Sequence, residues 1–311
     1  MSRLCGVACA LLVLVAMLAT ATVAGARGRR AAEASAKAPA GDRALRHRVH
    51  RPPARTAIVN GTQISIAQAP WQVAVLAEFA GESLLCGGSI IGPKEVVTAA
   101  HCVFDETTDQ PIPAADFEVR AGTADLLASE PTLQERSVSS VRPHPYYNPT
   151  EPLPRADDLA VLTLSAPLTE TAGSVQKLAL SALGVGPPEG TAVGLTGFGE
   201  ESSSPPDLNG KLNAISMTTA FPRRCGGESD ALYVCASTPS GSLCSGDSGS
   251  ALTTPGSPAT AIGVTDTVQI IQAVACRPGA GGGFANLAAP EIADFVGGSE
   301  SPPRAPRGGG D

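Results

Sequence analysis

The sequence has few aromatic residues, few charged residues and no CxxC pair of cysteines. Only 4% of its 311 residues are aromatic and 16% are charged, so the core must be built from Val, Leu, Ile and Ala. Without a CxxC pair, a zinc ribbon or an iron–sulfur centre is improbable. The formal charge of −7 argues against a nucleic-acid or anionic-membrane partner.

Apolar and turn-forming residues, by contrast, are abundant. Hydrophobic residues make up 43% of the chain, which is a globular composition, and the chain is long enough for one large core or two small ones. It contains 34 Gly and 27 Pro, about a fifth of all residues, which favours many turns and short strands over long helices.

Residues 1–26 have the features of a secretory signal peptide, with Arg3 followed by an apolar run at 7–19 and then small residues. The run is shorter than the roughly 20 residues of a membrane-spanning helix, so a cleaved signal is favoured over an anchor. Cys5 and Cys9 would leave with it. The remaining cysteines are even in number and would enter an oxidising compartment, which favours disulfides. We therefore predict a secreted, extracellular protein.

Residues 27–57 differ in composition from the rest of the chain. Together with Arg3 they hold ten of the 22 basic residues but only two of the 29 acidic ones, and they show no hydrophobic periodicity. Such a segment cannot bury enough apolar surface to offset its ordering entropy, so we predict a linker or pro-segment. The remainder has 12 basic and 27 acidic residues, a formal charge of −15. We expect the functional domain at 58–297 and a disordered tail at 298–311.

Short β-type segments separated by turn residues recur through the predicted domain. No strand–helix–strand alternation is present, and the only good helical candidate is residues 290–296. Many short strands in about 240 residues predict an all-β sandwich or a pair of barrels. The expected strands are residues 71–78, 84–92, 95–102, 117–123, 159–165, 191–199, 211–219, 231–237, 261–268 and 282–288.

The segment Cys-Ser-Gly-Asp-Ser-Gly-Ser at residues 244–250 contains a candidate nucleophile. A serine hydroxyl reacts only when a base removes its proton and donors stabilise the oxyanion that forms. Gly246 has no Cβ to obstruct a reacting carbonyl, so the N–H groups of Gly246 and Ser248 could form an oxyanion hole. Taken by itself, a Gly- and Ser-rich stretch can also be an ordinary loop.

A histidine and an aspartate beside hydrophobic segments add a second signal. His101 lies in a Thr-Ala-Ala-His-Cys segment, and Asp158 begins an Asp-Leu-Ala-Val-Leu run. From residue 58 onward the chain has only two histidines, His101 and His144, which narrows the choice of a base. His144 stands in a turn-like His-Pro-Tyr-Tyr-Asn segment, which indicates a structural role. Asp157 is the competing candidate to Asp158.

The motifs TAAHC, DLAVL and GDSGS, in this order and spacing, resemble those of the trypsin-like (chymotrypsin-fold) serine peptidases. The resemblance covers about residues 58–296, nearly all of the predicted mature chain. It implies an all-β fold of two six-stranded antiparallel β-barrels, with the site between them and a short C-terminal helix, in agreement with the strand pattern. It also implies a serine endopeptidase without a cofactor.

Carried over to the matching positions, the resemblance makes Ser248 the nucleophile, His101 the general base and then acid, and Asp158 the residue that orients the imidazole. The apolar run that directly follows Asp158 favours it over Asp157. The resemblance also selects the disulfides Cys86–Cys102, Cys225–Cys235 and Cys244–Cys276.

The segment Ile-Val-Asn-Gly that begins at Ile58 resembles the new N-terminus of an activated member of this family. Cleavage before Ile58 would create an ammonium group that inserts beside Ser248 and pairs with Asp247. The bond to be cut follows Ala57, whereas the nearest basic residue is Arg55. A peptidase that prefers small apolar residues would therefore release Ile58. Mature copies of this protein are predicted to have that preference, and could process the precursor in trans.

The primary pocket departs from that of family members that cut after Lys or Arg. Those enzymes have an Asp at the pocket floor, where this chain has Ser242. A neutral floor leaves a buried cation without a partner, which is costly, so we predict cleavage after apolar residues. Thr265 and Thr267 are further predicted pocket residues, in the segment that usually reads Ser-Trp-Gly. Asp266, between them, would place a carboxylate in the substrate groove. As an alternative, Asp266 or another nearby carboxylate could supply the charge that the pocket floor lacks.

Where the family has a calcium loop, this chain offers only Asp125, Glu130 and Glu135 as acidic residues, and we predict no metal. The resemblance implies protein or peptide substrates, proteinaceous protease inhibitors as partners, no membrane contact in the mature form, and a monomer. Because every catalytic position is retained, an active enzyme is favoured over the alternative function, a catalytically inactive homologue that acts as a binding protein. A third interpretation, a disulfide-braced structural domain without an active site, would require the three motifs around His101, Asp158 and Ser248 to occur together by coincidence.

Overall fold

The computed structural model describes residues 58–150, 157–181, 184, 186–202, 208–226, 232–268 and 276–298. The predicted signal peptide, the basic segment and the predicted tail after Gly298 lie outside the described residues. Within the described ranges, no helix is both long enough and apolar enough to cross a membrane.

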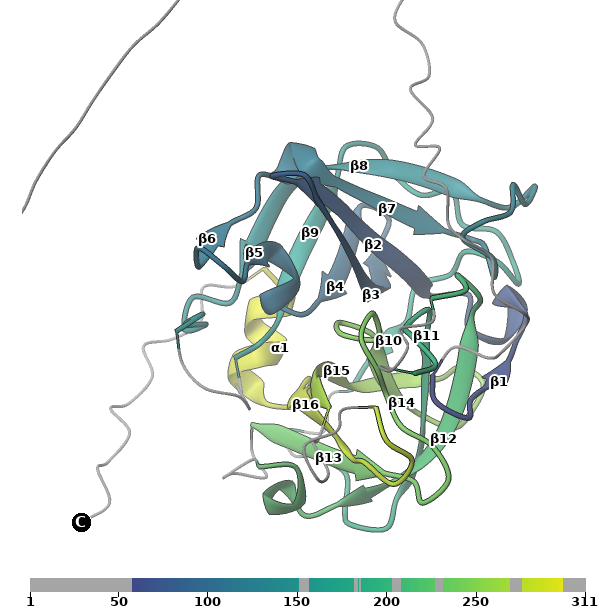
Figure 1. Ribbon diagram of the computed structural model, residues 1–311, viewed down its shortest axis with the longest axis vertical. Coiled ribbons are helices and arrows are strands. Elements are labelled where there is room, and N and C mark those ends of the chain that lie inside the picture. Colours follow the sequence, from purple (N-terminus) through teal and green to yellow (C-terminus); the bar gives the residue numbers. More distant parts are fainter. Residues whose placement is uncertain are drawn as a thin grey trace, which may run out of the picture. The chain divides into compact units, whose positions relative to one another are not determined.

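Six antiparallel strands form a first closed barrel (Figure 1), and hydrophobic alternation explains their inward faces. In β7, for example, Phe117, Val119 and Ala121 are buried, while Glu118 and Arg120 between them are more exposed. The pairing of β2 with β7 closes the barrel. Its strands, in spatial order, are β2 (Gln72–Phe79), β3 (Glu82–Gly92), β4 (Glu95–Thr98), β9 (Ala160–Leu164), β8 (Gln134–Pro143) and β7 (Phe117–Ala121).

A second set of six antiparallel strands forms the second barrel, which is closed by the pairing of β12 with β13. In spatial order its strands are β11 (Ala192–Gly197), β12 (Asn213–Ala220), β13 (Tyr233–Ser237), β16 (Gly282–Asn286), β15 (Thr260–Val268) and β14 (Ala251–Thr254). The short β1 (Thr62–Gln63) is added to β12, and β10 (Ala179–Leu180) runs parallel to β15. The predicted fold of two six-stranded antiparallel barrels is confirmed.

The remaining regular elements connect or cover the barrels. A hairpin of β5 (Phe104–Asp105) and β6 (Gln110–Pro111) follows the first histidine of the domain. The only α-helix in the described residues is α1 (Pro290–Val296), at the residues predicted from the sequence. Short 3-10 helices are η1 (Ile66–Gln68), η2 (His101–Val103), η3 (Ala114–Asp116) and η4 (Pro222–Cys225).

The cores consist mainly of Val, Leu, Ile and Ala, as the low aromatic content predicts. The largest cluster fills the first barrel and extends to α1, where Ile292 and Phe295 are buried. Arg142 of β8 fixes the helix from the other side: its guanidinium group donates to the Phe295 carbonyl at 2.9 Å and lies 4.3 Å from the ring centre. A separate aliphatic cluster fills the second barrel.

Candidate active site

His101 and Asp158 come from the ends of neighbouring strands in the first barrel. Strand β4 pairs with β9 so that Thr98 lies opposite Ala160. After Thr98 the chain turns into η2, which begins at His101, so the strand is shorter than the predicted 95–102. Asp158 lies just before β9. Antiparallel pairing therefore brings the two side chains to the same edge of the barrel.

Asp158 holds His101 through two hydrogen bonds. Its Oδ1 accepts the backbone N–H of His101 at 2.7 Å, and its Oδ2 lies 2.6 Å from Nδ1 of the imidazole. Asp158 is fully buried, whereas 18% of the His101 side chain is exposed. Burial opposes charge on His101, but the carboxylate of Asp158 outweighs it and raises the pKa of His101. Burial also opposes ionisation of Asp158, yet the charge and hydrogen bonds of His101 lower its pKa.

The competing carboxylate, Asp157, faces a different histidine. Its Oδ1 lies 3.6 Å from Nδ1 of His144, and both side chains are buried. The His144 ring packs edge-on against Phe295 of α1, with 4.8 Å between ring centres. Asp157 and His144 thus belong to the packing of the helix on the first barrel.

Ser248 lies in the loop between β13 and β14, in a backbone conformation that depends on two glycines. Gly246 and Gly249 adopt φ values of 93° and 82°, a region that favours glycine. A Cβ at Gly249 would also collide with Thr98 Oγ1 and with the carbonyl of Gly87. The loop is tied to the first barrel, because the Gly87 N–H donates to the Ser248 carbonyl at 2.7 Å.

Asp247 is a fully buried carboxyl group beside the nucleophile. It accepts the backbone N–H of Gly199 at 3.0 Å and that of Cys244 at 2.9 Å. Burial raises the pKa of Asp247 to about 7, although the two backbone donors oppose this shift. Ile58 is fully buried as well, and the residue after it, Val59, forms a β-bridge with Ser242. The start of the described chain therefore lies against the segment that leads to Asp247.

Three disulfides brace the loops around these residues. Cys86–Cys102 joins β3 to η2, directly after His101. Cys244–Cys276 joins the Ser248 loop to the segment that precedes β16. The third, Cys225–Cys235, joins η4 to β13. These are the three pairs that the resemblance implies.

Residues from both barrels line one cavity of about 450 Å³. The first barrel contributes His101 and residues of the β5–β6 hairpin, and the second contributes Leu243, Ser248 and residues 265–267. Ser242, the predicted pocket floor, is fully buried, is not among the lining residues, and donates its hydroxyl to the Leu243 carbonyl. Leu243 itself packs so closely on Gly282 that a Cβ there would collide with its Cδ1.

Asp266 is among the residues that line the cavity, yet its carboxylate is almost completely buried. It is only 3% exposed, and one of its carboxylate oxygens lies within 4.8 Å of both Asp158 and His101. Its Oδ2 accepts the Tyr233 hydroxyl at 2.8 Å. Strand β15 has a register shift between Thr265 and Thr267 where it pairs with β16, and such bulges re-aim a side chain. Alternation along the sequence carries no sign of this shift, so sequence reasoning misses the contact.

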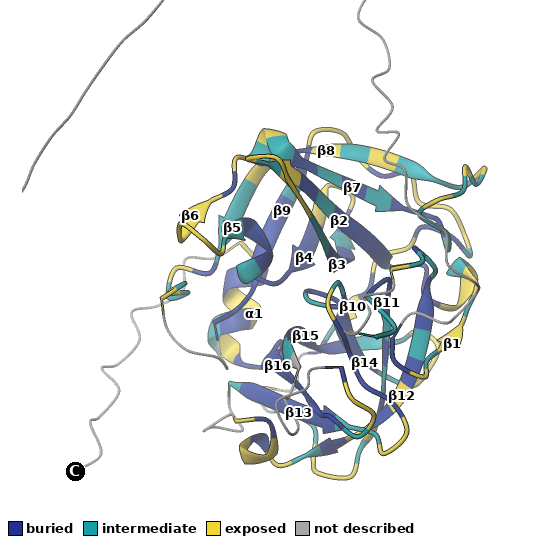
Figure 2. Ribbon diagram, in the orientation of Figure 1, coloured by how far each residue is buried: buried dark blue, intermediate teal, exposed yellow. Residues whose placement is uncertain are grey.

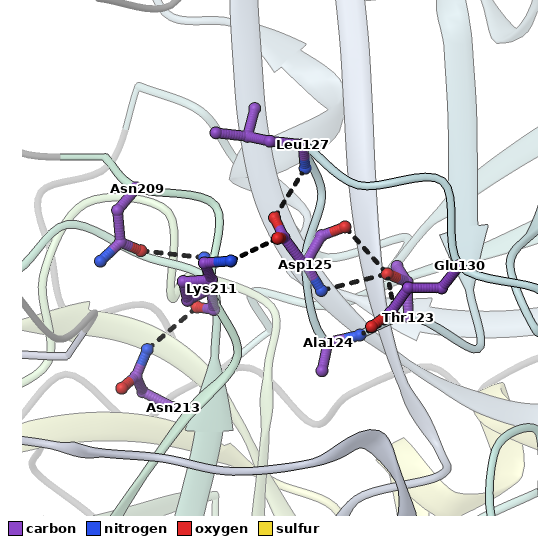
Figure 3. A network of polar contacts seen from close by, with 8 residues as sticks. All are labelled: Thr123, Ala124, Asp125, Leu127, Glu130, Asn209, Lys211 and Asn213. Carbon is purple, nitrogen blue, oxygen red and sulfur yellow. Dashed lines mark hydrogen bonds and ion pairs between the residues drawn. The ribbon is translucent and has the colours of Figure 1, made fainter. Parts of the chain in front are cut away.

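The three acidic residues of the expected calcium loop are engaged with protein groups. In Figure 3, Lys211 forms an ion pair with Asp125, and Glu130 Oε2 accepts from Thr123 Oγ1 at 2.6 Å. Glu135 lies 3.2 Å from the guanidinium group of Arg120. Because Lys211 lies two residues before the start of β12, its ion pair ties this loop of the first barrel to the second barrel.

Two closed six-stranded antiparallel barrels with a shared cavity place the protein in the chymotrypsin-fold class, and comparisons with known proteins agree. A family model described as trypsin matches residues 58–285. Trypsin beta of Drosophila erecta is 30% identical over 206 residues, 64% of this chain and 74% of that protein. Trypsin alpha of Drosophila melanogaster is 28% identical over 206 residues, 64% of this chain and 73% of the relative. Kallikrein 1-related peptidase b24 of Mus musculus is 34% identical over 123 residues, which are 37% of this chain and 43% of that protein.

The chain therefore belongs to the trypsin family. It is a trypsin-like serine endopeptidase, a hydrolase with protein substrates.

Proposed function

We propose that this peptidase cleaves peptide bonds through Ser248, His101 and Asp158 and a covalent acyl-enzyme. Its main support is the geometry of the His101–Asp158 pair, because His101 lines the same cavity as a partly exposed Ser248. Because Nδ1 of His101 is held by Asp158, Nε2 is the nitrogen that can act as a base.

In the first half of the reaction, Ser248 Oγ attacks the substrate carbonyl carbon while His101 Nε2 takes the hydroxyl proton. His101 then gives that proton to the leaving amine, and the C–N bond breaks. In the second half, water attacks the acyl ester, again with His101 as base and then acid, and Ser248 is released. Asp158 stays ionised throughout and stabilises the imidazolium.

The backbone N–H groups of Gly246 and Ser248 are the proposed donors to the oxyanion. Within the described part of the chain, neither N–H donates a hydrogen bond to another protein group. Donors that are fixed in place before the reaction stabilise the developing charge without reorganising. The disulfides on either side of the site hold the His101 turn and the Ser248 loop in place.

The protein is proposed to be secreted as a precursor, with a signal peptide at 1–26, a pro-segment at 27–57 and a peptidase domain at 58–297. Family members are typically secreted. In the mature enzyme the new ammonium group of Ile58 would pair with Asp247. The burial of both residues supports this pairing, because an unpaired carboxylate is unfavourable at such a position.

The mature enzyme is proposed to cut after apolar residues, to act as a monomer and to be inhibited by proteinaceous inhibitors. An apolar preference is supported by Leu243, which lines the cavity next to Ser242, the buried and neutral residue at the position of the charged pocket floor. A peptide-library cleavage profile tests it. Apolar residues should dominate the position before the cut, and a profile dominated by Arg or Lys would contradict the assignment.

Replacement of Ser248 or His101 by Ala tests the mechanism. Each change should lower kcat by about 10⁶-fold, and the double variant should lose little more, because the two groups act as a unit. Folding should survive, since neither side chain belongs to a hydrophobic core. Substantial peptidase activity in Ser248→Ala would show that the assigned mechanism is wrong.

A further inference from the structure

One buried carboxyl group beside the proposed catalytic residues has no role in the mechanism above. Asp266 reaches Asp158 and His101 from the second barrel, on strand β15. It is 3% exposed and Asp158 is fully buried. Two carboxylates this close and this deeply buried repel each other strongly, so one of them retains a proton.

The hydrogen-bond partners indicate which carboxyl group is ionised. Asp158 accepts two hydrogen bonds from His101 and lies against the group that becomes the imidazolium. Asp266 accepts from the Tyr233 hydroxyl, which carries no charge, because burial and then the nearby Asp266 keep the pKa of Tyr233 above its ordinary value. The better-stabilised anion is therefore Asp158.

We propose that Asp266 is a positioning residue of the active site: its protonated carboxyl group donates a hydrogen bond to Asp158 and so fixes the carboxylate that orients His101. The inference rests on the proposed function, because Asp158 is the residue that orients His101 in that mechanism. Burial opposes ionisation of Asp158, but the charge and the side-chain hydrogen bond of His101, and after them a hydrogen bond with Asp266, lower its pKa.

The register shift in β15 explains how this side chain arrives there. Thr265 keeps the strand in contact with the nucleophile loop, because its N–H and hydroxyl both donate to the Ser250 carbonyl, at 2.9 and 2.8 Å. Thr265 then pairs with Phe284 and Thr267 with Gly283, leaving Asp266 as the bulged residue between them. The bulge places the carboxyl group beside Asp158, at the wall of the cavity.

The protonation state can be measured without any enzymatic activity. Infrared difference spectra are recorded at pH 7 between the full chain carrying Ser248→Ala and the same chain with Asp266→Asn added. A carbonyl band of a neutral carboxyl group, shifted in D₂O, should be present only when Asp266 is present. If the difference contains carboxylate bands alone, Asp266 is ionised and the proposal is overturned. This result stands whether or not the proposed cleavage mechanism is correct.

Kinetics of the processed enzyme test the positioning role. Asp266→Ala should lower kcat about tenfold to a hundredfold, the value of a hydrogen bond to a charged group, with KM within twofold. Asp266→Asn should recover most of that loss, because its amide can donate to Asp158. Asp294→Ala is the control, since this carboxylate is exposed on α1. Wild-type kcat in Asp266→Ala, or no recovery in Asp266→Asn, would contradict a donor role.

The pH profile separates positioning from a general loss of structure. Ionisation of Asp266 removes the donor and adds a charge beside Asp158, so wild-type kcat should have an alkaline decrease that Asp266→Asn lacks. Tyr233→Phe removes a donor to the ionised form, which raises the pKa of Asp266 and should move this decrease to higher pH. The other titratable groups that line the cavity are His101 and Tyr147 and, on the segment that carries β5 and β6, Asp105, Glu106 and Asp109. An alkaline limb identical in all three enzymes would overturn the proposal.

Discussion

The carboxyl group of Asp247 should make the precursor less stable as the pH rises. While the 57–58 peptide bond is intact, Ile58 has no ammonium group to offer. Asp247 is fully buried, and burial raises its pKa from 3.8 to about 7. The N–H groups of Cys244 and Gly199 oppose this shift, and the charge of Glu200 adds to it. The folded precursor thus binds this proton more tightly than the unfolded chain does. Its stability is highest below about pH 4 and is lost progressively up to about pH 7.

The size of the effect follows from the pKa shift. One pKa unit corresponds to about 1.4 kcal/mol, so a shift from 3.8 to about 7 corresponds to about 4 kcal/mol at most. For a domain of this size, about 4 kcal/mol changes Tm by roughly 8–16 °C. Asn is a suitable replacement for Asp247 because it is neutral and, like the protonated acid, keeps one oxygen that only accepts.

The assay is urea and thermal unfolding of the full-length precursor between pH 4 and 8. Ser248→Ala is present throughout, so that the protein cannot digest itself. Adding Asp247→Asn should remove about 4 kcal/mol of the pH dependence, whereas the exposed control Asp294→Asn should leave it unchanged. Equal pH dependence with and without Asp247 would refute the reasoning.

Processing provides the second half of the same test. Once the chain begins at Ile58, its ammonium group would pair with Asp247 and favour the carboxylate, so the loss of stability towards pH 8 should disappear. The processed Ser248→Ala protein should therefore be more stable than its precursor at pH 8 and differ less at pH 4. If processing leaves the profile unchanged, the ion pair is absent.

Two further predictions concern the choice of aspartate and the origin of the mature enzyme. Asp158→Asn should lower kcat about 10⁴-fold, because the imidazole is then held in the wrong tautomer. Asp157→Asn should change kcat less than tenfold. If Asp157→Asn had the larger effect, the roles of the two aspartates would be exchanged. Incubating Ser248→Ala precursor with a trace of active enzyme should give a new N-terminus at Ile58, by N-terminal sequencing. A precursor left intact, or cut only after Arg55, would exclude self-processing in trans.

The sequence predicts best those strands that carry one hydrophobic face. Strand β8 is not predicted, because in Gln134–Pro143 only Val138 is buried, and Figure 2 shows most of this strand as intermediate or exposed. Its position is determined by backbone pairing with β7 and β9, which leaves no periodic signal. The four-residue β14 is missed for another reason, since it follows the Ser248 loop too closely to be distinguished from it.

The candidate site shows a similar division. Motif order and family resemblance bring His101, Asp158 and Ser248 to attention, because these residues stand in short local patterns. The contact between Asp266 and Asp158 depends on a bulge and on packing between two barrels, and neither leaves a local pattern. The same holds for Ser242, which the alignment of motifs assigns to the pocket floor and which is fully buried and does not line the cavity in the structure.

Ser250 stands where the family usually has a glycine, and its contacts show how the two barrels accommodate each other at the nucleophile loop. A larger residue two positions after the nucleophile needs space and a partner for its hydroxyl. Gly87 of β3 supplies the space, since a Cβ there would collide with Ser250 Oγ. Gln72 of β2 supplies the partner: its Nε2 donates to Ser250 Oγ at 3.2 Å, and its Oε1 accepts from Thr196 of β11 at 2.8 Å. One buried amide thus links the nucleophile loop to both barrels, so the position of Ser248 relative to His101 depends on contacts that neither barrel provides alone.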